Sequence, residues 1–191
     1  VSISASAYGD FEVEGIAYSI ESENEVSVSA RGLDEKYSGS IIIPSEVIHQ
    51  GKTYLVTSIE SMAFDNCKSL TEVTIPATVS QIGFSAFDGC TSLINISLPD
   101  EIELIPKDCF RSCSNLQNIK LPRKLKSISE EAFVYCTSLQ TIDFPNSLQM
   151  IEKNAFSQCY SLNNIILPAS LTVIPEGCFH GCRNLTNVEL N

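Results

Sequence analysis

The residues best suited to chemistry lie near the C-terminus, in the stretch Cys178-Phe179-His180-Gly181-Cys182. Two thiols four residues apart with a histidine between them have the ligand types of a zinc site. Both cysteines, however, stand at positions that repeat along the chain together with leucine and phenylalanine. The position of His180 is variable, since it holds Asp65, Asp88, Arg111, Val134 and Ser157 in the other copies. The pattern therefore favours cysteines that pack in a core, and it predicts no metal site.

Carboxylates offer a second kind of chemistry, because a pair of them can hydrolyse a glycosidic bond. Asp100, Glu101 and Glu103 lie close together, and Glu130-Glu131 lies one repeat further on. The two histidines, His49 and His180, are far apart, and neither a nucleophile elbow nor a glycine-rich phosphate loop is present. We interpret the carboxylates as a solvated face. The sequence predicts no catalytic set and no cofactor.

A repeat of 23 residues must position all of these groups. Its prolines are Pro76, Pro99, Pro122, Pro145 and Pro168, and its phenylalanines are Phe64, Phe87, Phe110, Phe133, Phe156 and Phe179. Cysteines recur with the same step at Cys67, Cys90, Cys113, Cys136, Cys159 and Cys182. The pattern reads L-x-x-[IV]-x-[ILF]-P-x-x-[ILV]-x-x-I-x-x-x-[AC]-F-x-x-C-x-x-L.

Each half of the repeat favours a different local structure. In the first half, apolar residues two apart are typical of one face of a strand, and the proline that follows ends it. In the second half, Ala-Phe and the cysteine three residues on can share one face of a helical turn. A unit this short cannot bury its own apolar side. The copies are therefore expected to stack into a solenoid with one continuous core.

The repeat resembles the BspA-like leucine-rich repeat of bacterial surface proteins, in its short treponemal class, over about Ile41 to Asn191. The resemblance implies an α/β solenoid: a leucine-rich-repeat right-handed superhelix with short parallel strands, short helical turns and an N-terminal β-rich cap. It also implies a role in adhesion or recognition, and it names no ligand.

Two regions are predicted. Residues 1–40 form an N-terminal segment and β-rich cap, and residues 41–191 form the solenoid of about six coils. Residues 1–9 are expected to be loose, a tight hairpin turns at Glu14-Gly15, and residues 25–30 form a third strand. The first repeat is irregular, with a hairpin insertion near residues 48–56 that turns at Gln50-Gly51.

Composition restricts the partners and the compartment. A net charge of -11 argues against nucleic acid, whose phosphates need a basic surface. No run of 18 apolar residues is present, so no membrane span is expected. The chain has no initiator methionine and no signal-like segment. We expect an exported protein, secreted or at a bacterial cell surface, whose signal has been removed.

Eight cysteines in an exported chain would ordinarily indicate disulfides. Here six share one repeat position, and Cys109 and Cys178 replace the alanine before phenylalanine. Residues that recur in phase with leucine, or alternate with alanine, behave as small buried apolar groups. The sequence therefore predicts free, buried thiols, although neighbouring coils would bring the cysteines within bridging distance.

The candidate binding residues flank the inward residue of each strand and are expected to point outward from the concave side. One row is Glu72, Asn95, Asn118, Thr141, Asn164 and Asn187, and the next is Thr74, Ser97, Lys120, Asp143, Ile166 and Glu189. We predict a binding site at Glu72, Asn95, Ser97, Asn118, Lys120, Thr141, Asp143, Asn164, Ile166 and Asn187. The alternative is that asparagine is simply common on exposed strands of such repeats.

Two further surfaces are weaker candidates. An apolar stripe could run along Ser58, Gln81, Leu104, Ser127, Met150 and Val173. Lys120, Arg123, Lys124 and Lys126 form a basic cluster, which we interpret as a solvated corner. The predicted function is non-catalytic recognition or adhesion at a bacterial cell surface, through a protein or glycan ligand. The alternatives are a targeting or scaffold module of a larger exported protein, and a hydrolase.

Overall fold

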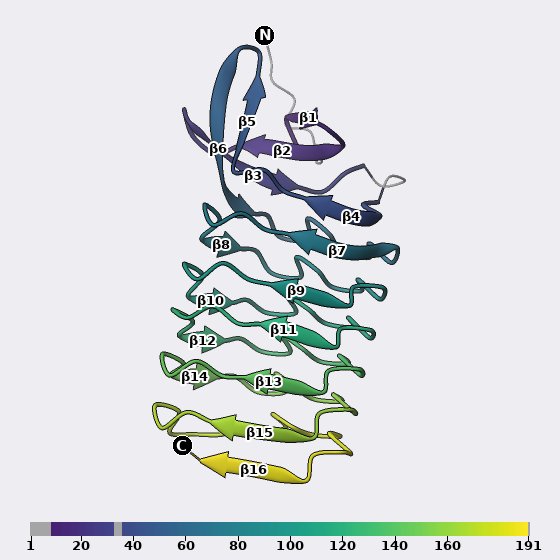
Figure 1. Cartoon of the computed structure of the whole chain (residues 1–191), viewed down its shortest axis with the longest axis vertical. Coiled ribbons are helices and arrows are strands. Elements are labelled where there is room, and N and C mark those ends of the chain that lie inside the picture. The colour runs from purple at the N-terminus through teal and green to yellow at the C-terminus, as the bar shows by residue number, and fades with distance from the viewer. Residues whose placement is uncertain (1–8, 33–35, 191) are drawn as a thin grey trace.

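The computed structural model describes residues 9–32 and 36–190. The chain winds into a stack of coils along the long axis of the molecule, with strands β1 to β6 at the N-terminal end and β16 at the other (Figure 1). One hydrophobic cluster runs through the whole stack, from Ile16 in the N-terminal sheet to Cys178 near the C-terminus. The division predicted at residue 40 stays a prediction, since strand β4 (Gly39–Ile42) crosses it and pairs with the coil strand β7 (Leu70–Thr74).

The N-terminal sheet covers the first coil. Its strands are β1 (Phe11–Val13), β2 (Ile16–Ile20), β3 (Glu25–Ser29), β6 (Lys52–Ile59) and β5 (Glu46–His49), in that spatial order. Two antiparallel hairpins turn at Glu14-Gly15 and Gln50-Gly51, the turns that the sequence predicts. All four turn residues have positive φ, between 50° and 80°, as the tightest two-residue hairpins require. Most of residues 1–9, expected to be loose, lie outside the described residues.

Two rows of parallel strands run along the coils. The first row is β4, β7, β9 (Asn95–Ser97) and β11 (Asn118–Lys120), continued by β13 (Thr141–Asp143), β15 (Asn164–Leu167) and β16 (Asn187–Leu190). The second row is β8 (Gln81–Ile82), β10 (Leu104–Ile105), β12 (Ser127–Ile128) and β14 (Met150–Ile151). From β7 onward, paired residues are counterparts one repeat apart, for example Ile96 and Ile119. The parallel strands that the sequence predicts are therefore present.

A column of phenylalanine rings forms the centre of the core. Phe64, Phe87, Phe110, Phe133 and Phe156 are fully buried. Their rings are stacked with centroids 5.0 to 5.3 Å apart and nearly parallel planes. Phe179 continues the column at 5.7 Å. Offset stacking of this kind adds to the burial energy of each ring.

The short helical turns that were predicted are not observed, because the described residues contain no helix. From Phe64 to Phe156 the amide of each core phenylalanine donates to the next coil instead of to its own turn, as Phe133 does to the carbonyl of Ala155 at 2.8 Å. Residues two before and two after this phenylalanine, Glu131 and Tyr135, have φ of 57° and 63°. Left-handed residues on both sides prevent a right-handed helical turn. The same arrangement recurs in the other coils.

All eight cysteines are free thiols, and every one except the half-buried Cys182 is buried. Five of them, beginning with Cys90, have Sγ within 3.1 to 3.2 Å of the carbonyl oxygen of a phenylalanine in the preceding coil. The thiol is therefore part of the contact between coils. No described helix is long and apolar enough to cross a membrane.

Candidate ligand-binding face

The exposed side of strands β7, β9, β11, β13, β15 and β16 is called the strand face below. The inward residues Val73, Ile96, Ile119, Ile142 and Ile165 enter the core, so the residues on either side of each must point outward. All ten predicted binding residues are exposed on this face: Glu72, Asn95, Ser97, Asn118, Lys120, Thr141, Asp143, Asn164, Ile166 and Asn187. The structure places them as the repeat predicts, and their binding role stays a prediction.

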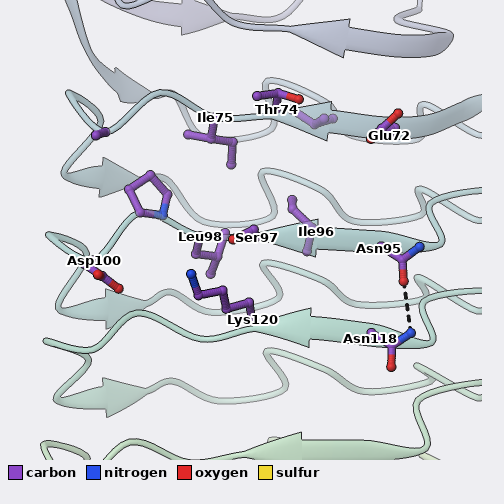
Figure 2. Close-up of a pocket in the computed structure, with 13 residues that line it drawn as sticks. Glu72, Thr74, Ile75, Asn95, Ile96, Ser97, Leu98, Asp100, Asn118 and Lys120 are labelled. Carbon is purple, nitrogen blue, oxygen red and sulfur yellow. Dashed lines mark hydrogen bonds between the residues drawn. The ribbon is translucent and has the colours of Figure 1, made fainter.

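The asparagine row is brought together most closely at Asn95 and Asn118. The side-chain amide of Asn118 donates from Nδ2 to Oδ1 of Asn95 at 3.0 Å (Figure 2). Further along, Asn164 pairs in register with Asn187, but the Nδ2 of Asn187 donates to Glu189 Oε1 at 2.7 Å. The expected array of amides is therefore strongest over β9 and β11.

A hollow with a cavity volume of about 640 Å³ lies over β7, β9 and β11, and it is called the Asn95 pocket below. This volume falls in the range of small-molecule sites. Glu72, Asn95 and Asn118 lie toward one end, while Lys120 and Asp100 lie toward the other (Figure 2). The rest of its lining is Val73, Thr74, Ile75, Ala77, Ile96, Ser97, Leu98 and Pro99. A smaller hollow of about 280 Å³ lies over β13 and β15, beside Asn164 and Asp143.

The charged side chains of the Asn95 pocket differ in whether they already have partners within the protein. Asp100 accepts the backbone amide of Arg123 at 3.1 Å and pairs with its guanidinium at 3.6 Å. Glu72 accepts the hydroxyl of Ser40 at 3.2 Å. The side chain of Lys120 has no ion pair or hydrogen bond to any described residue. Its ammonium group is therefore available to a ligand.

The predicted basic cluster is largely neutralised within the protein. Lys124 pairs with Glu101 and Lys126 pairs with Glu103, both at 2.7 Å, and Arg123 pairs with Asp100. Each partner lies 23 residues earlier, at the corresponding position of the preceding coil. The repeat spacing could have revealed these pairs from the sequence. Only Lys120 is left over, and it belongs to the strand face.

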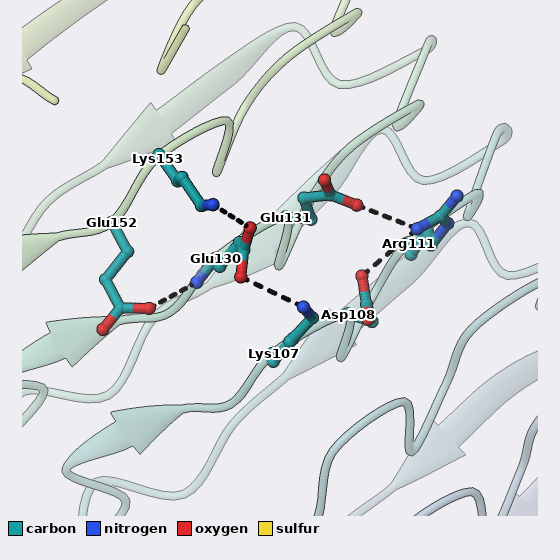
Figure 3. Close-up of polar contacts among 7 residues, drawn as sticks. All are labelled: Lys107, Asp108, Arg111, Glu130, Glu131, Glu152 and Lys153. Carbon is teal, nitrogen blue, oxygen red and sulfur yellow. Dashed lines mark hydrogen bonds and ion pairs between the residues drawn. The ribbon is translucent and has the colours of Figure 1, made fainter. Parts of the chain in front are cut away.

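The Glu130-Glu131 pair is also held by cations. Glu130 accepts bonds from Lys107 at 3.0 Å and Lys153 at 2.9 Å, and Arg111 bridges Asp108 and Glu131 (Figure 3). The bonds from Lys153 and Lys107 lower the pKa of Glu130. A carboxylate held in its ionised form cannot serve as the general acid of a glycosidase.

One carboxyl behaves in the opposite way. Desolvation, with the charge of Asp65 next, raises the pKa of Asp88 to about 6. Asp88 follows Phe87 in the turn between the two strand rows, and it lines none of the four hollows described for the chain. Its raised pKa therefore has a structural origin and indicates no catalytic site.

The apolar residues of the predicted stripe are exposed. Leu104 and Met150 are about half exposed, at 46% and 48%, and Val173 is 67% exposed. A hollow of about 410 Å³ lies next to Leu104, and Glu101 and Glu103 line it. Both of these carboxylates are already paired with lysines. In the described part of the chain, no group of three or more histidine, cysteine or acidic residues could hold a metal ion.

The parallel strands, the stacked phenylalanine column and the repeat in register define a leucine-rich-repeat solenoid. A profile of the BspA type Leucine rich repeat region matches residues 40–159 and 105–191, in six copies. The chain belongs to the BspA-type leucine-rich repeat family. Proteins of this family are generally surface or adhesion-type repeat proteins.

Solved structures agree with this assignment. A leucine-rich repeat protein of Bacteroides ovatus is 33% identical, with a TM-score of 0.75, and the match covers 94% of this chain and 53% of that one. The leucine-rich repeat protein of Treponema pallidum is 32% identical, with a TM-score of 0.82 and coverage of 94% and 81%. The chain thus spans about half the length of the Bacteroides protein. A comparison with curated proteins finds no significant match.

Sequence reasoning missed several residues that shape the Asn95 pocket. Ile75, Ala77, Pro99 and Asp100 lie beyond the strand ends, where the chain turns after each proline position. The repeat carries a signal for them, because Ala77 and Asp100 occupy the same position in successive copies, directly after the proline. The sequence predicted Thr74 on an exposed row, but it could not predict that Thr74 lines the hollow, because the hollow forms only when three coils stack.

Proposed function

We propose that this protein is a non-catalytic recognition protein at a bacterial cell surface, which binds a protein or glycan through the strand face. Membership in the BspA-type family supports the surface role. The observation that carries the proposal is the Asn95 pocket, with its volume of about 640 Å³ and its exposed polar residues on three adjacent strands. Adhesion is the activity for which such a face is suited.

Rigidity supports binding at this face. The backbone of β7 and β9 is paired on both sides, so the side chains of Glu72 and Asn95 project from a fixed frame. Ordering costs are small when a site is already formed before the ligand arrives. Each hydrogen bond contributes only about 0.5–1.5 kcal/mol net, so recognition must use several coils. The row from Glu72 to Asn187 supplies such a distributed surface.

Localisation and catalysis are part of the same proposal. The protein is exported and stays at the surface or in the medium. Its carboxylates at 100–103 and 130–131 are engaged in ion pairs between coils, which leaves them a structural role. We therefore assign no reaction to the chain.

The experiment is a binding survey of the fluorescently labelled full chain on arrays of extracellular-matrix proteins and of glycans. We expect a defined set of positive spots. The triple variant Asn95→Ala, Asn118→Ala, Asn164→Ala should weaken binding to these spots at least tenfold, with an unchanged melting temperature. A matched variant on the second strand row, Gln81→Ala with Leu104→Ala and Met150→Ala, should bind like the wild type. The proposal is overturned when the asparagine variant binds normally and the matched variant does not.

A further inference from the structure

The lysine and arginine residues of this acidic protein are almost all engaged. Of the twelve, seven form ion pairs: Arg31, Lys107, Arg111, Arg123, Lys124, Lys126 and Lys153. Lys36 donates to the carbonyl of Asp65, and Lys52 and Arg183 lie over tyrosine rings. Among the described residues, only Lys68 and Lys120 contact no carboxylate, carbonyl or ring.

These two lysines differ in their surroundings. Lys68 is exposed in a turn and lines none of the described hollows, whereas Lys120 lines the Asn95 pocket. Asp100 lies in the same pocket but is paired with Arg123. Lys120 is therefore the uncommitted cation of the strand face, and a ligand carboxylate is the group that it can best receive.

The opposite end of the pocket suits hydroxyl groups. The bond between Asn118 and Asn95 uses one hydrogen of Asn118 and one oxygen of Asn95. The Nδ2 group of Asn95 and the Oδ1 atom of Asn118 remain to donate and accept, and the carboxylate of Glu72 accepts as well. Neighbouring hydroxyls of a sugar both donate and accept. Ile75, Ala77 and Pro99 provide apolar surface for the C–H face of its ring.

We propose that the Asn95 pocket binds a carboxylate-bearing sugar, a uronic or sialic acid, as the terminal or exposed unit of an acidic glycan. Its carboxylate pairs with Lys120, and its ring hydroxyls bond to Asn95, Asn118 and Glu72. This inference rests on the proposed function and names the ligand class of the same face.

Two alternatives fit the observations less well. A protein of net charge -11 repels a densely charged polyanion more strongly than a single carboxylate, and the single carboxylate can pair with Lys120. An extended peptide that adds a strand needs a free sheet edge, but β7 and β9 are each paired on both sides. The pocket is also local, since the hollow beside Asn164 is separate and much smaller.

The test is a titration of the isotope-labelled full chain, followed by amide chemical shifts. The probes are sodium glucuronate and N-acetylneuraminic acid, each with its methyl ester as the uncharged counterpart, and the capped peptide acetyl-Gly-Glu-Gly-amide. We expect one or both acids to shift the side-chain amides of Asn95 and Asn118, with the esters at least about tenfold weaker. The acid that binds more tightly shows whether the ligand is a uronic acid or a sialic acid.

Two variants complete the experiment. Lys120→Met should weaken the binding of the acid about tenfold, while the matched variant Lys68→Met should leave it unchanged. The inference is overturned by esters that bind as well as the acids, by an unaltered affinity of Lys120→Met, or by absence of sugar binding at the pocket. If only the peptide binds at the pocket, the inference of a sugar ligand is overturned, whereas the wider proposal of recognition by the strand face is retained. The array survey with the asparagine variant tests that wider proposal separately.

Discussion

The Sγ atom of Cys113 lies 3.1 Å from the carbonyl oxygen of Phe87 in the preceding coil. Phe87 also donates an inter-coil bond of its own, from its amide to the carbonyl of Cys109 at 2.9 Å. A thiol is small and apolar enough for the core and can still act as a weak donor. This combination explains why cysteine recurs at a position enclosed by leucine and phenylalanine.

The thiols should be unreactive while the chain is folded. Burial raises the pKa of every cysteine, to about 12 for Cys178, so little thiolate is available. We expect an aromatic disulfide reagent at pH 8 to modify Cys182 first, because it is only half-buried, and all eight after denaturation without reductant. The variant Cys182→Ser should remove the early phase. Recovery of fewer than four thiols in denaturant would instead indicate disulfides.

Alkaline pH should destabilise the stack through the same residues. Desolvation holds the thiol pKa values above 9.0, so folding stability from the neutral thiols is fully present below about pH 9 and is lost as pH rises further. The free energy of unfolding should therefore fall above pH 9. The decline should be shallower in Cys136→Ala, which removes one fully buried thiol. Parallel pH profiles for the two proteins would contradict this explanation.

Phe133 should be essential to the middle of the stack. Its ring is fully buried and stacks on Phe110 at 5.3 Å and on Phe156 at 5.0 Å. We expect Phe133→Ala to lower the free energy of unfolding by about 3–5 kcal/mol, as large-to-small core changes do. Denaturant titration measures the loss, and Met150→Ala, at a half-exposed position, is the control. A loss below about 1 kcal/mol would place Phe133 outside the cooperative core.

Asp88 should make the protein more stable in mild acid. Its raised pKa of about 6, against 3.8 when unfolded, means that the folded chain holds the proton more tightly. This stabilising contribution is complete below about pH 4 and is lost as pH rises through 6. At pH 7 we expect Asp88→Asn to gain about 1 kcal/mol, after allowance for solvent screening, with no gain at pH 4. Asp143→Asn on the exposed strand face serves as the control, and an equal gain at both pH values would exclude the mechanism.

At position 135, glycine should give a more stable protein than alanine. Its φ is 63°, a value that L-residues avoid. In two other coils the same repeat position is occupied by glycine, as Gly89 and Gly181. The side chain is 45% exposed, so little burial is lost. We expect Tyr135→Gly to raise the free energy of unfolding by about 0.5–1 kcal/mol relative to Tyr135→Ala, which keeps the strained backbone. Thermal unfolding of the three proteins would decide, and an alanine variant more stable than the glycine variant would refute the idea.

The 23-residue period of the sequence was sufficient to predict most of the fold. Alternation around Ile96 and Ile119 predicted strands and an exposed row, and the recurrence of phenylalanine and cysteine predicted the core. The helical turn was wrong because apolar spacing at Ala132, Phe133 and Cys136 does not reveal where the amides donate. The amides of Glu131, Phe133 and Tyr135 donate to the next coil, which a pattern within one repeat cannot show. The Asn95 pocket likewise depends on the stacking of three coils, so its exposed residues were predictable but its shape was not.

Many contacts between coils join a residue to its counterpart in the adjacent repeat, as Lys124 joins Glu101 and Ile119 joins Ile96. A recombination event that inserts or removes one whole repeat would leave each remaining neighbour a matching surface. It would change only which exposed side chains come to lie beside one another. The exposed strand face of such a protein can therefore diversify by exchanging repeats as units, while the enclosed column of rings is preserved.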